Sequence, residues 1–439
     1  MSATPGGLGT LFAVRREERA QVALAVGAFF CVLFSVFLLR PLRDAVALVG
    51  GAENLKYLWA VSLLGTIVAS LAFAQATSRW PRRRFFALTF RTVACLWLAF
   101  VPAIASAEGE LAVFVARAFY VVHAVTNVFL VSIVWALLAD AFDSAAARRL
   151  FGLVSVGGTL GAIAGSSTTA AVARAAKSQP GGDSERMIAL ALVLAAALVL
   201  ELAVQFGLAL VRRSRAASAT PEQSERSLGG TWSEGLALVL SRPYLQAVAA
   251  FTFLHGVLQS VLALQQSFLA AREFDSSAAR SEYFAWTESA VQGTTLFVQL
   301  FVTSRLIRRF GVGAALLVLP AFGVLALAAL GVEAALGLGA LGVLTLALVA
   351  WKALSHSVMR PARESLFAGT EPREKYKAKS FLDTFAFRGG DVASAWVQGT
   401  AALGTVALVA LPFACVWGGL AAWLGRRAPG RSSDALSER

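Results

Sequence analysis

The sequence predicts an all-α polytopic membrane protein, and three observations lead to this prediction. Of the 439 residues, 57% are hydrophobic, only 15% are charged, and the mean hydropathy is +0.68. Soluble domains carry about 25% charged residues. Apolar runs of about 20 residues recur along the chain, and each is long enough to cross a bilayer as a helix. The sequence does not show the alternating segments of about ten residues that are typical of outer-membrane barrels.

The apolar runs and the polar residues that interrupt them define about twelve candidate transmembrane helices. These spans are 20–48, 56–77, 85–106, 111–139, 150–174, 187–211, 244–271, 281–303, 311–331, 333–355, 379–404 and 405–425. The fourth, fifth and eleventh spans carry more polar residues than the others do.

The distribution of basic residues orients these spans. If the N-terminus is cytoplasmic, the cytoplasmic segments hold most of the 39 Lys and Arg residues, and the external loops hold few. The positive-inside rule therefore predicts a bacterial inner (plasma) membrane protein with both termini in the cytoplasm. The same bias accounts for most of the net charge of +13, so we expect the lipid bilayer and no nucleic acid as a partner. The first apolar run has no cleavage signal before it and is expected to stay as an anchor helix.

The longest polar stretch, "RRSRAASATPEQSERSLGG" from Arg212 to Gly230, divides the chain into two halves. It is rich in Ser, Ala and charge and is typical of a flexible linker. The predicted organisation is a cytoplasmic N-terminus (1–19), a six-helix bundle (20–211), a cytoplasmic linker (212–243), a second six-helix bundle (244–425) and a cytoplasmic tail (426–439).

The two halves also resemble each other. "SRWPRRRFFAL" follows the second span, and "SRLIRRFGVGAALL" follows the eighth. A basic segment leads into a GG pair in the fifth and the eleventh spans, at Gly157-Gly158 and Gly389-Gly390. These echoes at matching positions favour an internal duplication. Two pseudo-symmetric six-helix bundles with cytoplasmic termini are typical of the major facilitator superfamily, where the substrate binds between the bundles.

The first span contains charges that demand an explanation. Arg40, Arg43 and Asp44 surround Pro41 within the apolar run "FFCVLFSVFLLRPLRDAVALVGGAEN". A charge in hydrocarbon costs several kcal/mol unless it faces the protein interior and is paired, so intramembrane charges mark candidate functional sites. We predict a substrate site in a helix broken at Pro41. The alternative is that both arginines extend to the outer interface of the membrane.

The same reasoning finds further candidates in later spans. Lys352 and Arg388 are basic, whereas Glu288, Asp383 and Asp391 are acidic residues suited to ion pairing or coupling. Basic residues outnumber acidic ones within the spans, so the sequence predicts a net positive cavity and an anionic small-molecule substrate. We expect Arg91 to extend to the cytoplasmic interface, and Glu201 to be a solitary residue kept neutral by burial.

Nothing in the sequence indicates an enzyme. It contains no HExxH or GxSxG motif and has only three His and three Cys residues, so we expect neither a metal site nor a cofactor. The cysteines lie in apolar segments and are expected to be small packing residues.

Several stretches resemble the ATP/ADP translocases of intracellular bacteria and plastids. "RPLRDAVALVGGAENLKYLW" is similar to that family's RSLKDTLVVT followed by GAE, with Arg43 at the position of the family's lysine. "WALLADAFDSAAARRLFGLVSVGG" is similar to its WQFANEIT segment, with Asp140 at the glutamate. "RPARESLFAGTEPREKYKAKSFLDTFAFRGGD" is similar to a third motif and brings in Lys379, Asp383 and Arg388. The resemblance implies nucleotide exchange by alternating access.

The sequence departs from this family in the seventh span. Ser260, Ala263 and Gln266 stand where the family has Asn, Glu and Lys, so two charges are lost. Another anionic substrate is therefore compatible with the sequence. Two further hypotheses remain open: a proton-coupled transporter with Glu288 or Asp44 as the proton carrier, and a non-transporting membrane sensor or scaffold.

Overall fold

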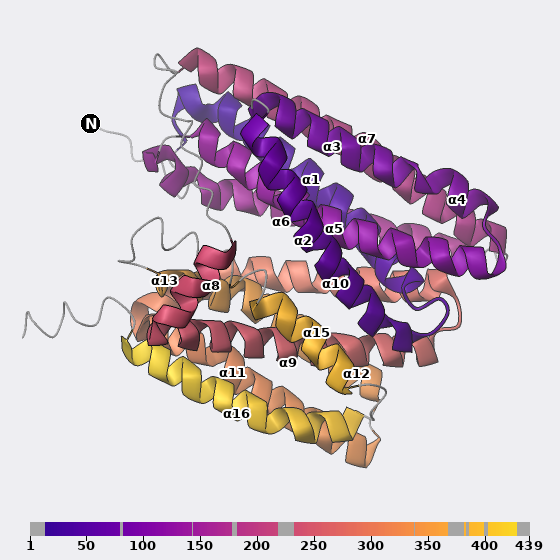
Figure 1. The fold of residues 1–439 in the computed structure, drawn as a ribbon, viewed down its shortest axis with the longest axis vertical. Helices are drawn as coiled ribbons and strands as arrows, with labels where there is room; N and C mark the ends of the chain where they lie inside the picture. Colours follow the sequence, from indigo (N-terminus) through magenta and orange to yellow (C-terminus); the bar gives the residue numbers. More distant parts are fainter. Residues whose placement is uncertain are drawn as a thin grey trace, which may run out of the picture. The chain divides into compact units, whose positions relative to one another are not determined.

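The computed structural model describes most of the chain, and the described part is helical. The described residues are 14–79, 82–142, 144–177, 182–217, 232–337, 339–367, 382, 386–398 and 403–427. Within these ranges no strand is present, and the helices are linked by short turns (Figure 1). The all-α prediction is confirmed.

The chain divides into two compact units. Unit 1 consists of 1–50, 61–227 and 275–289, and unit 2 consists of 51–60, 228–274 and 290–439. The main division, after residue 227, falls within the stretch predicted as a linker. The short segments 51–60 and 275–289 are each counted with the unit that is built mainly from the other half of the sequence.

Unit 1 is organised around its first helix. Its helices are α1 (Arg19–Val46), α2 (Leu55–Arg79), α3 (Arg82–Leu98), α4 (Phe100–Ser106), α5 (Gly109–Ala141), α6 (Ser144–Lys177), α7 (Gly182–Ala217) and the beginning of α10 (Ser277–Val298) (Figure 1). Helix α1 packs against α5, α6 and α7. Leu38, Leu130, Leu138 and Leu200 lie fully buried in this core.

Unit 2 has a core of large aromatic side chains. Its helices are α8 (Trp232–Ser241), α9 (Pro243–Glu273), the remainder of α10, α11 (Ser304–Leu336), α12 (Ala340–Leu354), α13 (Arg360–Ser365), α15 (Phe387–Gln398) and α16 (Leu403–Arg427). Trp351, Trp417 and Phe251 are fully buried, and their packing joins α9, α12 and α16.

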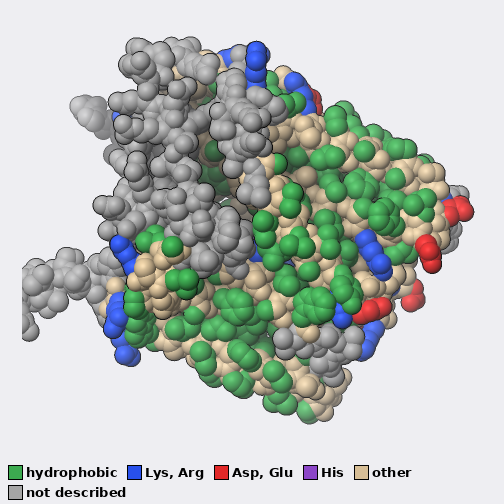
Figure 2. Space-filling view, in the orientation of Figure 1, with side chains coloured by type: hydrophobic (Ala, Val, Ile, Leu, Met, Phe, Trp, Pro, Cys, Tyr) green, Lys and Arg blue, Asp and Glu red, His purple; other side chains and the backbone are tan. Residues whose placement is uncertain are grey.

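Nine helical stretches in the described part are long and apolar enough to cross a membrane. One of them, Ser277–Leu336, covers both the eighth and the ninth predicted spans, which join through a π-helical turn at Gln299–Thr303. A break at Gly311, with φ of 80°, separates the two parts. Helix α2 occupies the second predicted span, whereas the eleventh is described only in part. Hydrophobic side chains cover much of the described surface in Figure 2, as a lipid-facing protein requires.

The predicted linker contains more helix than the sequence indicated. Helix α7 continues to Ala217, and α8 forms a separate helix of ten residues before α9. The stretch predicted to be flexible, 212–230, therefore begins within α7. Helix α8 lies after that stretch; it is rich in apolar residues, and its buried Val239 belongs to the core of unit 2.

The GG pairs mark equivalent helix contacts in the two units. In α6, a Cβ atom at Gly158 would lie 2.5 Å from the ring of Phe29, and one at Gly161 would collide with the carbonyl oxygen of Phe30 in α1. In α15, a Cβ atom at Gly390 would lie 2.5 Å from the carbonyl oxygen of Phe253 in α9. The fifth predicted span of each half thus approaches the first span of that half closely, which supports the internal repeat.

Gly161→Ala is expected to lower the thermal stability of the purified protein, because the added methyl group meets backbone that cannot rotate away. Overpacking of this kind costs roughly 1–3 kcal/mol. Gly152→Ala in the same helix is the matched control, because a Cβ atom at Gly152 meets nothing within 4 Å. The control should be unchanged or slightly more stable, since alanine favours helices. Equal melting temperatures for both variants would contradict the close α1–α6 contact.

Candidate functional site

The charged residues of α1 lie in a continuous helix. We expected a break at Pro41, but α1 runs without interruption from Arg19 to Val46 with Pro41 inside it. A proline in a helix removes one backbone hydrogen bond and crowds the preceding turn. Leu38, Leu39 and Leu42 are buried around Pro41. Their packing, together with that of α6 and α7 on α1, offsets the loss and keeps the helix intact.

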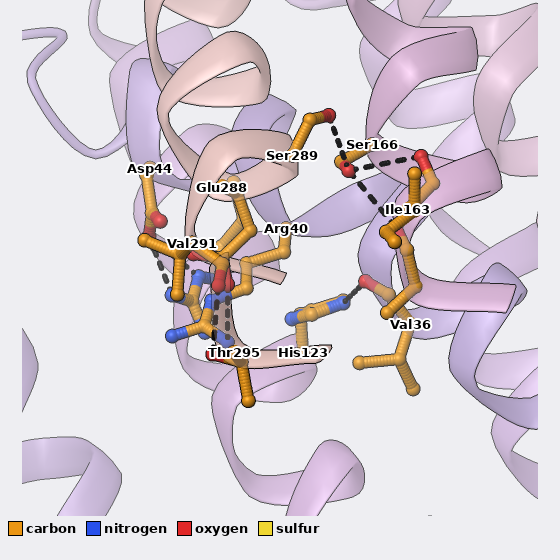
Figure 3. A network of polar contacts seen from close by, with 12 residues as sticks. Val36, Arg40, Asp44, His123, Ile163, Ser166, Glu288, Ser289, Val291 and Thr295 are labelled. Carbon is orange, nitrogen blue, oxygen red and sulfur yellow. Dashed lines mark hydrogen bonds and ion pairs between the residues drawn. The ribbon is translucent and has the colours of Figure 1, made fainter. Parts of the chain in front are cut away.

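Arg40 forms an ion pair with Glu288 of α10. Arg40 Nη1 lies 3.8 Å from Glu288 Oε1, and the side chain of Glu288 is only 7% exposed. Figure 3 shows the two side chains pointing toward one another. The guanidinium of Arg40 also lies over the ring of Phe37, 5.2 Å from its centroid. Nε of Arg40 is buried and has no hydrogen-bond partner among the described residues.

The two arginines lie in the last two turns of α1. Arg40 lies about 9 Å and Arg43 about 5 Å from the end of that helix at Val46. Glu288 lies about 16 Å along α10 from the beginning of that helix at Ser277. The interfacial alternative for the two arginines therefore stays open, although each of them is paired with a carboxylate.

Arg43 is held by its own neighbour in the sequence. Its Nε and Nη2 atoms donate to Asp44 Oδ1 at 2.9 and 2.5 Å. The guanidinium also lies over the ring of Tyr120 in α5, 5.0 Å from its centroid. The side chain of Arg43 is 12% exposed, so this cation is almost fully enclosed. Both of its short polar contacts go to a single carboxylate oxygen.

His123 and two serines lie beside these charges. His123 is fully buried in α5; its Nε2 lies 3.2 Å from the carbonyl oxygen of Val36, and its ring stacks on Trp97. Ser166 Oγ of α6 lies 2.8 Å from Ser289 Oγ, next in sequence to Glu288 (Figure 3). His123 is thus a hydrogen-bonded interior residue.

We name Arg40, Arg43, Asp44 and Glu288 the α1 charge cluster. It contains two cations and two carboxylates, so its formal charge is balanced. The net positive cavity that we expected concerns the charges of all spans together, so it stays a prediction to which this cluster adds no net charge. A buried cation without a counter-ion is too costly to maintain, which accounts for the balance within the cluster.

The remaining predicted residues fall in unit 2, in α5 or outside the described residues. Asp391 of α15 accepts a hydrogen bond from the hydroxyl of Ser260 in α9. Arg388 lies one helical turn before Asp391 and is half-buried, as is Lys352 in α12.

Asp140 belongs to the last turns of α5, although its side chain lies outside what is described. Lys379 and Asp383 lie outside the described residues.

Tyr120 is a component of this site that our sequence analysis missed. It lies three positions after Arg117 and three before His123, so the three residues follow one face of α5. Arg117 Nη2 donates to the carbonyl oxygen of Gly50 at 3.2 Å. The spacing of polar residues along one face of the fourth predicted span was the signal that would have identified Tyr120.

Our interpretation of Glu201 as a solitary residue was wrong, because Glu201 is paired with Arg91. Arg91 Nε and Nη2 donate to the two carboxylate oxygens of Glu201 at 3.0 and 2.8 Å. The sequence could not show this pair because α3 and α7 are distant along the chain.

Comparison with known proteins identifies the relatives of this chain. The family model described as "TLC ATP/ADP transporter" matches residues 111–411. No curated protein matches the sequence. Among solved structures, a bacterial homologue of the iron transporter ferroportin is 10% identical, with a TM-score of 0.66 over 93% of this chain and 98% of the other.

Two further structures have related folds. The nucleoside transporter NupG is 14% identical, with a TM-score of 0.57 over 93% of this chain and 99% of its own. The human organic anion transporter MFSD10 is 18% identical, with a TM-score of 0.56 over 93% of this chain and 100% of its own. At these identities the similarity establishes the fold alone, which is that of the major facilitator superfamily.

Glu288→Gln is expected to destabilise the protein, because it removes the carboxylate that pairs with Arg40 without changing side-chain size. We expect a loss of roughly 1–3 kcal/mol, less than for a fully buried pair, because Arg40 is partly exposed. Thermal unfolding of the purified protein measures it. The double variant Arg40→Gln/Glu288→Gln should recover part of the loss. Additive losses in the double variant would show that the two residues do not interact.

Proposed function

The chain belongs to the TLC ATP/ADP transporter family, and from this membership we propose that it exchanges nucleotides of the ATP/ADP type, or a closely related anion, across the membrane. It is a multi-pass membrane transporter and not an enzyme. One observation carries the proposal: two arginines, Arg40 and Arg43, lie three residues apart in the last two turns of α1, and each is paired with a carboxylate.

Guanidinium groups suit this substrate class. Arginine donates several N–H groups in a fixed planar arrangement that matches the oxygens of phosphate and carboxylate. In the α1 charge cluster, Asp44 and Glu288 occupy part of that capacity. A phosphate group carries more acceptor oxygens than a carboxylate does. It would bind by taking over contacts now made to Asp44 and Glu288, while Tyr120 holds the guanidinium of Arg43 in place.

This arrangement suggests why transport would require exchange. The proposed site is charge-balanced when empty, through the Arg43–Asp44 pair within α1 and the Arg40–Glu288 pair that connects α1 with α10. An anionic substrate that displaces Glu288 from Arg40 would loosen this connection and allow the loaded carrier to reorient. The empty carrier, with its ion pair intact, would reorient more slowly. Alternating access by bundle movement around a central site is the mechanism of this architecture.

Arg388, Lys352 and Lys379 are proposed to complete recognition of the substrate. Asp140, Asp383 and Asp391 are proposed as coupling or ion-pair residues. Ser260, one of the positions that departs from the family pattern, retains a polar role because it donates to Asp391. The loss of charge at Ala263 and Gln266 leaves the identity of the anion more open than the family name indicates.

We also propose that the protein resides in a bacterial inner membrane with both termini in the cytoplasm. The concentration of Lys and Arg in one set of connecting segments supports this orientation. A reporter that fluoresces only in the cytoplasm, fused to the C-terminus, tests this orientation. A fusion protein that is expressed at a normal level but does not fluoresce would contradict it.

Liposomes that contain the purified protein are expected to take up labelled ATP only when they are preloaded with ADP. Arg43→Ala should lower this uptake at least tenfold, because it removes the enclosed guanidinium, whereas Arg43→Lys should retain uptake because it keeps the cation. Arg212→Ala, an exposed arginine near the end of α7, is the matched control and should transport normally.

Other outcomes of the same assay would favour the alternatives. Uptake that follows a pH gradient and needs no internal ADP would support proton coupling, with Glu288 or Asp44 as the carrier. No uptake of any tested anion by folded protein would support a sensor or scaffold. Full activity of Arg43→Ala would refute the site assignment.

A further inference from the structure

An ion pair lies on the outward surface of unit 1, far from the α1 charge cluster in the sequence and on different helices. Arg91 of α3 binds both carboxylate oxygens of Glu201 of α7, and Gln205 Nε2 donates to Glu201 Oε1 at 2.6 Å. The side chains of Arg91 and Glu201 are 50% and 40% exposed. This polar group therefore faces the surroundings of the protein and not its core.

The apolar surroundings of the pair make this exposure costly. Glu201 lies about 25 Å from Ser184 and about 20 Å from Ser214, which bound one candidate membrane span, and Arg91 lies about 10 Å from Arg84, where its own candidate span begins. The pair thus lies inside both spans, nearer to the Arg84 end of α3. Exposed apolar side chains lie beside it in sequence, namely Leu88, Leu198 and Leu202. A charged group at the centre of a span costs about 2.5–3.5 kcal/mol on insertion scales, and charges within spans normally face other protein or a water-filled cavity.

Lipid headgroups lie at the membrane surface, whereas this pair lies about 10 Å inside the candidate span of α3. Arg91 is held there because Glu201 accepts from two of its donor atoms. A protein surface that covers the pair at this depth would provide polar partners. Polar side chains that face lipid in this way are typical of helix association in membranes.

The geometry of α3 and α7 fits a second copy of the same chain. The two helices are antiparallel neighbours, because Phe86 meets Gly207, Arg91 meets Glu201, and Ala107 accepts a hydrogen bond from Arg186. Arg91 and Glu201 consequently lie side by side at one depth. A two-fold axis along the membrane normal, passing between α3 and α7, would place Arg91 opposite Glu201 of the second copy and Glu201 opposite its Arg91.

We propose that the outer face of α3 and α7 is the interface of a homodimer. A two-fold interface must be complementary to itself, and a side-by-side pair of opposite charges meets that condition. The four charges would form a closed ring of alternating sign, which neutralises each of them and removes them from lipid. The proposal does not depend on which solute the protein transports.

A native cysteine allows the first test. Cys95 lies one turn after Arg91 in α3 and is exposed, Cys415 is exposed in unit 2, and Cys31 is buried. Packed helices lie about 8–10 Å apart. In the proposed dimer, α3 and α7 of the two copies form a group of four, and the two α3 helices lie on its diagonal, roughly 14 Å apart. A bismaleimide of that span, applied to membranes containing the full chain, should yield a dimer of this protein. Cys415→Ala should still crosslink, whereas Cys95→Ala should not.

Charge reversal in separate chains gives the second test. Arg91→Glu leaves two acids at the site, and Glu201→Arg leaves two cations, so each variant alone should lose at least tenfold in crosslinked dimer. When differently tagged Arg91→Glu and Glu201→Arg chains are co-expressed, they should copurify with each other. A chain that carries both Arg91→Glu and Glu201→Arg has opposite charges at the two positions again and should dimerise. This double variant is the control for folding, because it carries both reversed side chains.

Three results would overturn the proposal. The first is a folded wild-type protein that stays monomeric in membranes. The second is a Cys95 adduct with a different protein, which would mean that another membrane helix covers this face. The third is that the tagged chains copurify equally whatever charges they carry at positions 91 and 201. This result would show that the ion pair does not lie at the interface.

Discussion

The cost of enclosing charge in an apolar environment governs how this protein packs its first helix. Arg40 and Arg43 lie on α1, which contacts α5, α6 and α7, so any unpaired charge there would destabilise the core of unit 1. Each arginine has its own carboxylate, Glu288 or Asp44, and an aromatic ring against its guanidinium. The helix stays continuous through Pro41 because its neighbours pack tightly on every side.

The same constraint connects structure with the proposed transport cycle. Carboxylates that stabilise the arginines in the empty protein are also the groups that an anionic substrate must displace. Substrate binding and the loosening of α1 from α10 would then be a single event. A transporter with unpaired cations in an open cavity would bind anions more readily, but it would have no ion pair to restrain movement when empty. Under the proposed cycle, the balanced cluster would favour exchange over one-way transport.

Hydrophobic patterning predicted most of the fold. Helices that bury one face and meet lipid with another produce long apolar runs, and these runs located most of the spans. Patterning could not show that Ser277–Leu336 would join two spans through a π-helical turn, because the basic residues after Thr303 suggested a loop. Helix α8 was missed because its ten residues are too few for a membrane span, although they are mostly apolar and pack on α9.

The candidate site was predictable in part. Intramembrane charge identified Arg40, Arg43, Asp44 and Glu288 individually, but it could not pair Arg40 with a residue on a distant helix. The neutrality of the cluster was also hidden, because counting charges over all spans says nothing about which ones meet. The pairing of Arg91 with Glu201 escaped prediction for the same reason. Long-range contacts depend on how helices are arranged, and a single sequence does not contain that arrangement in readable form.

Binding of ADP and of adenosine to the purified protein would test the central claim most directly. The two compounds share base and ribose and differ in the anionic diphosphate, which the arginines of α1 are proposed to recognise. We predict that ADP raises the melting temperature of the wild-type protein and that adenosine at the same concentration does not. Equal stabilisation by both compounds would show that recognition does not involve the phosphate groups, and it would contradict the role assigned to Arg40 and Arg43.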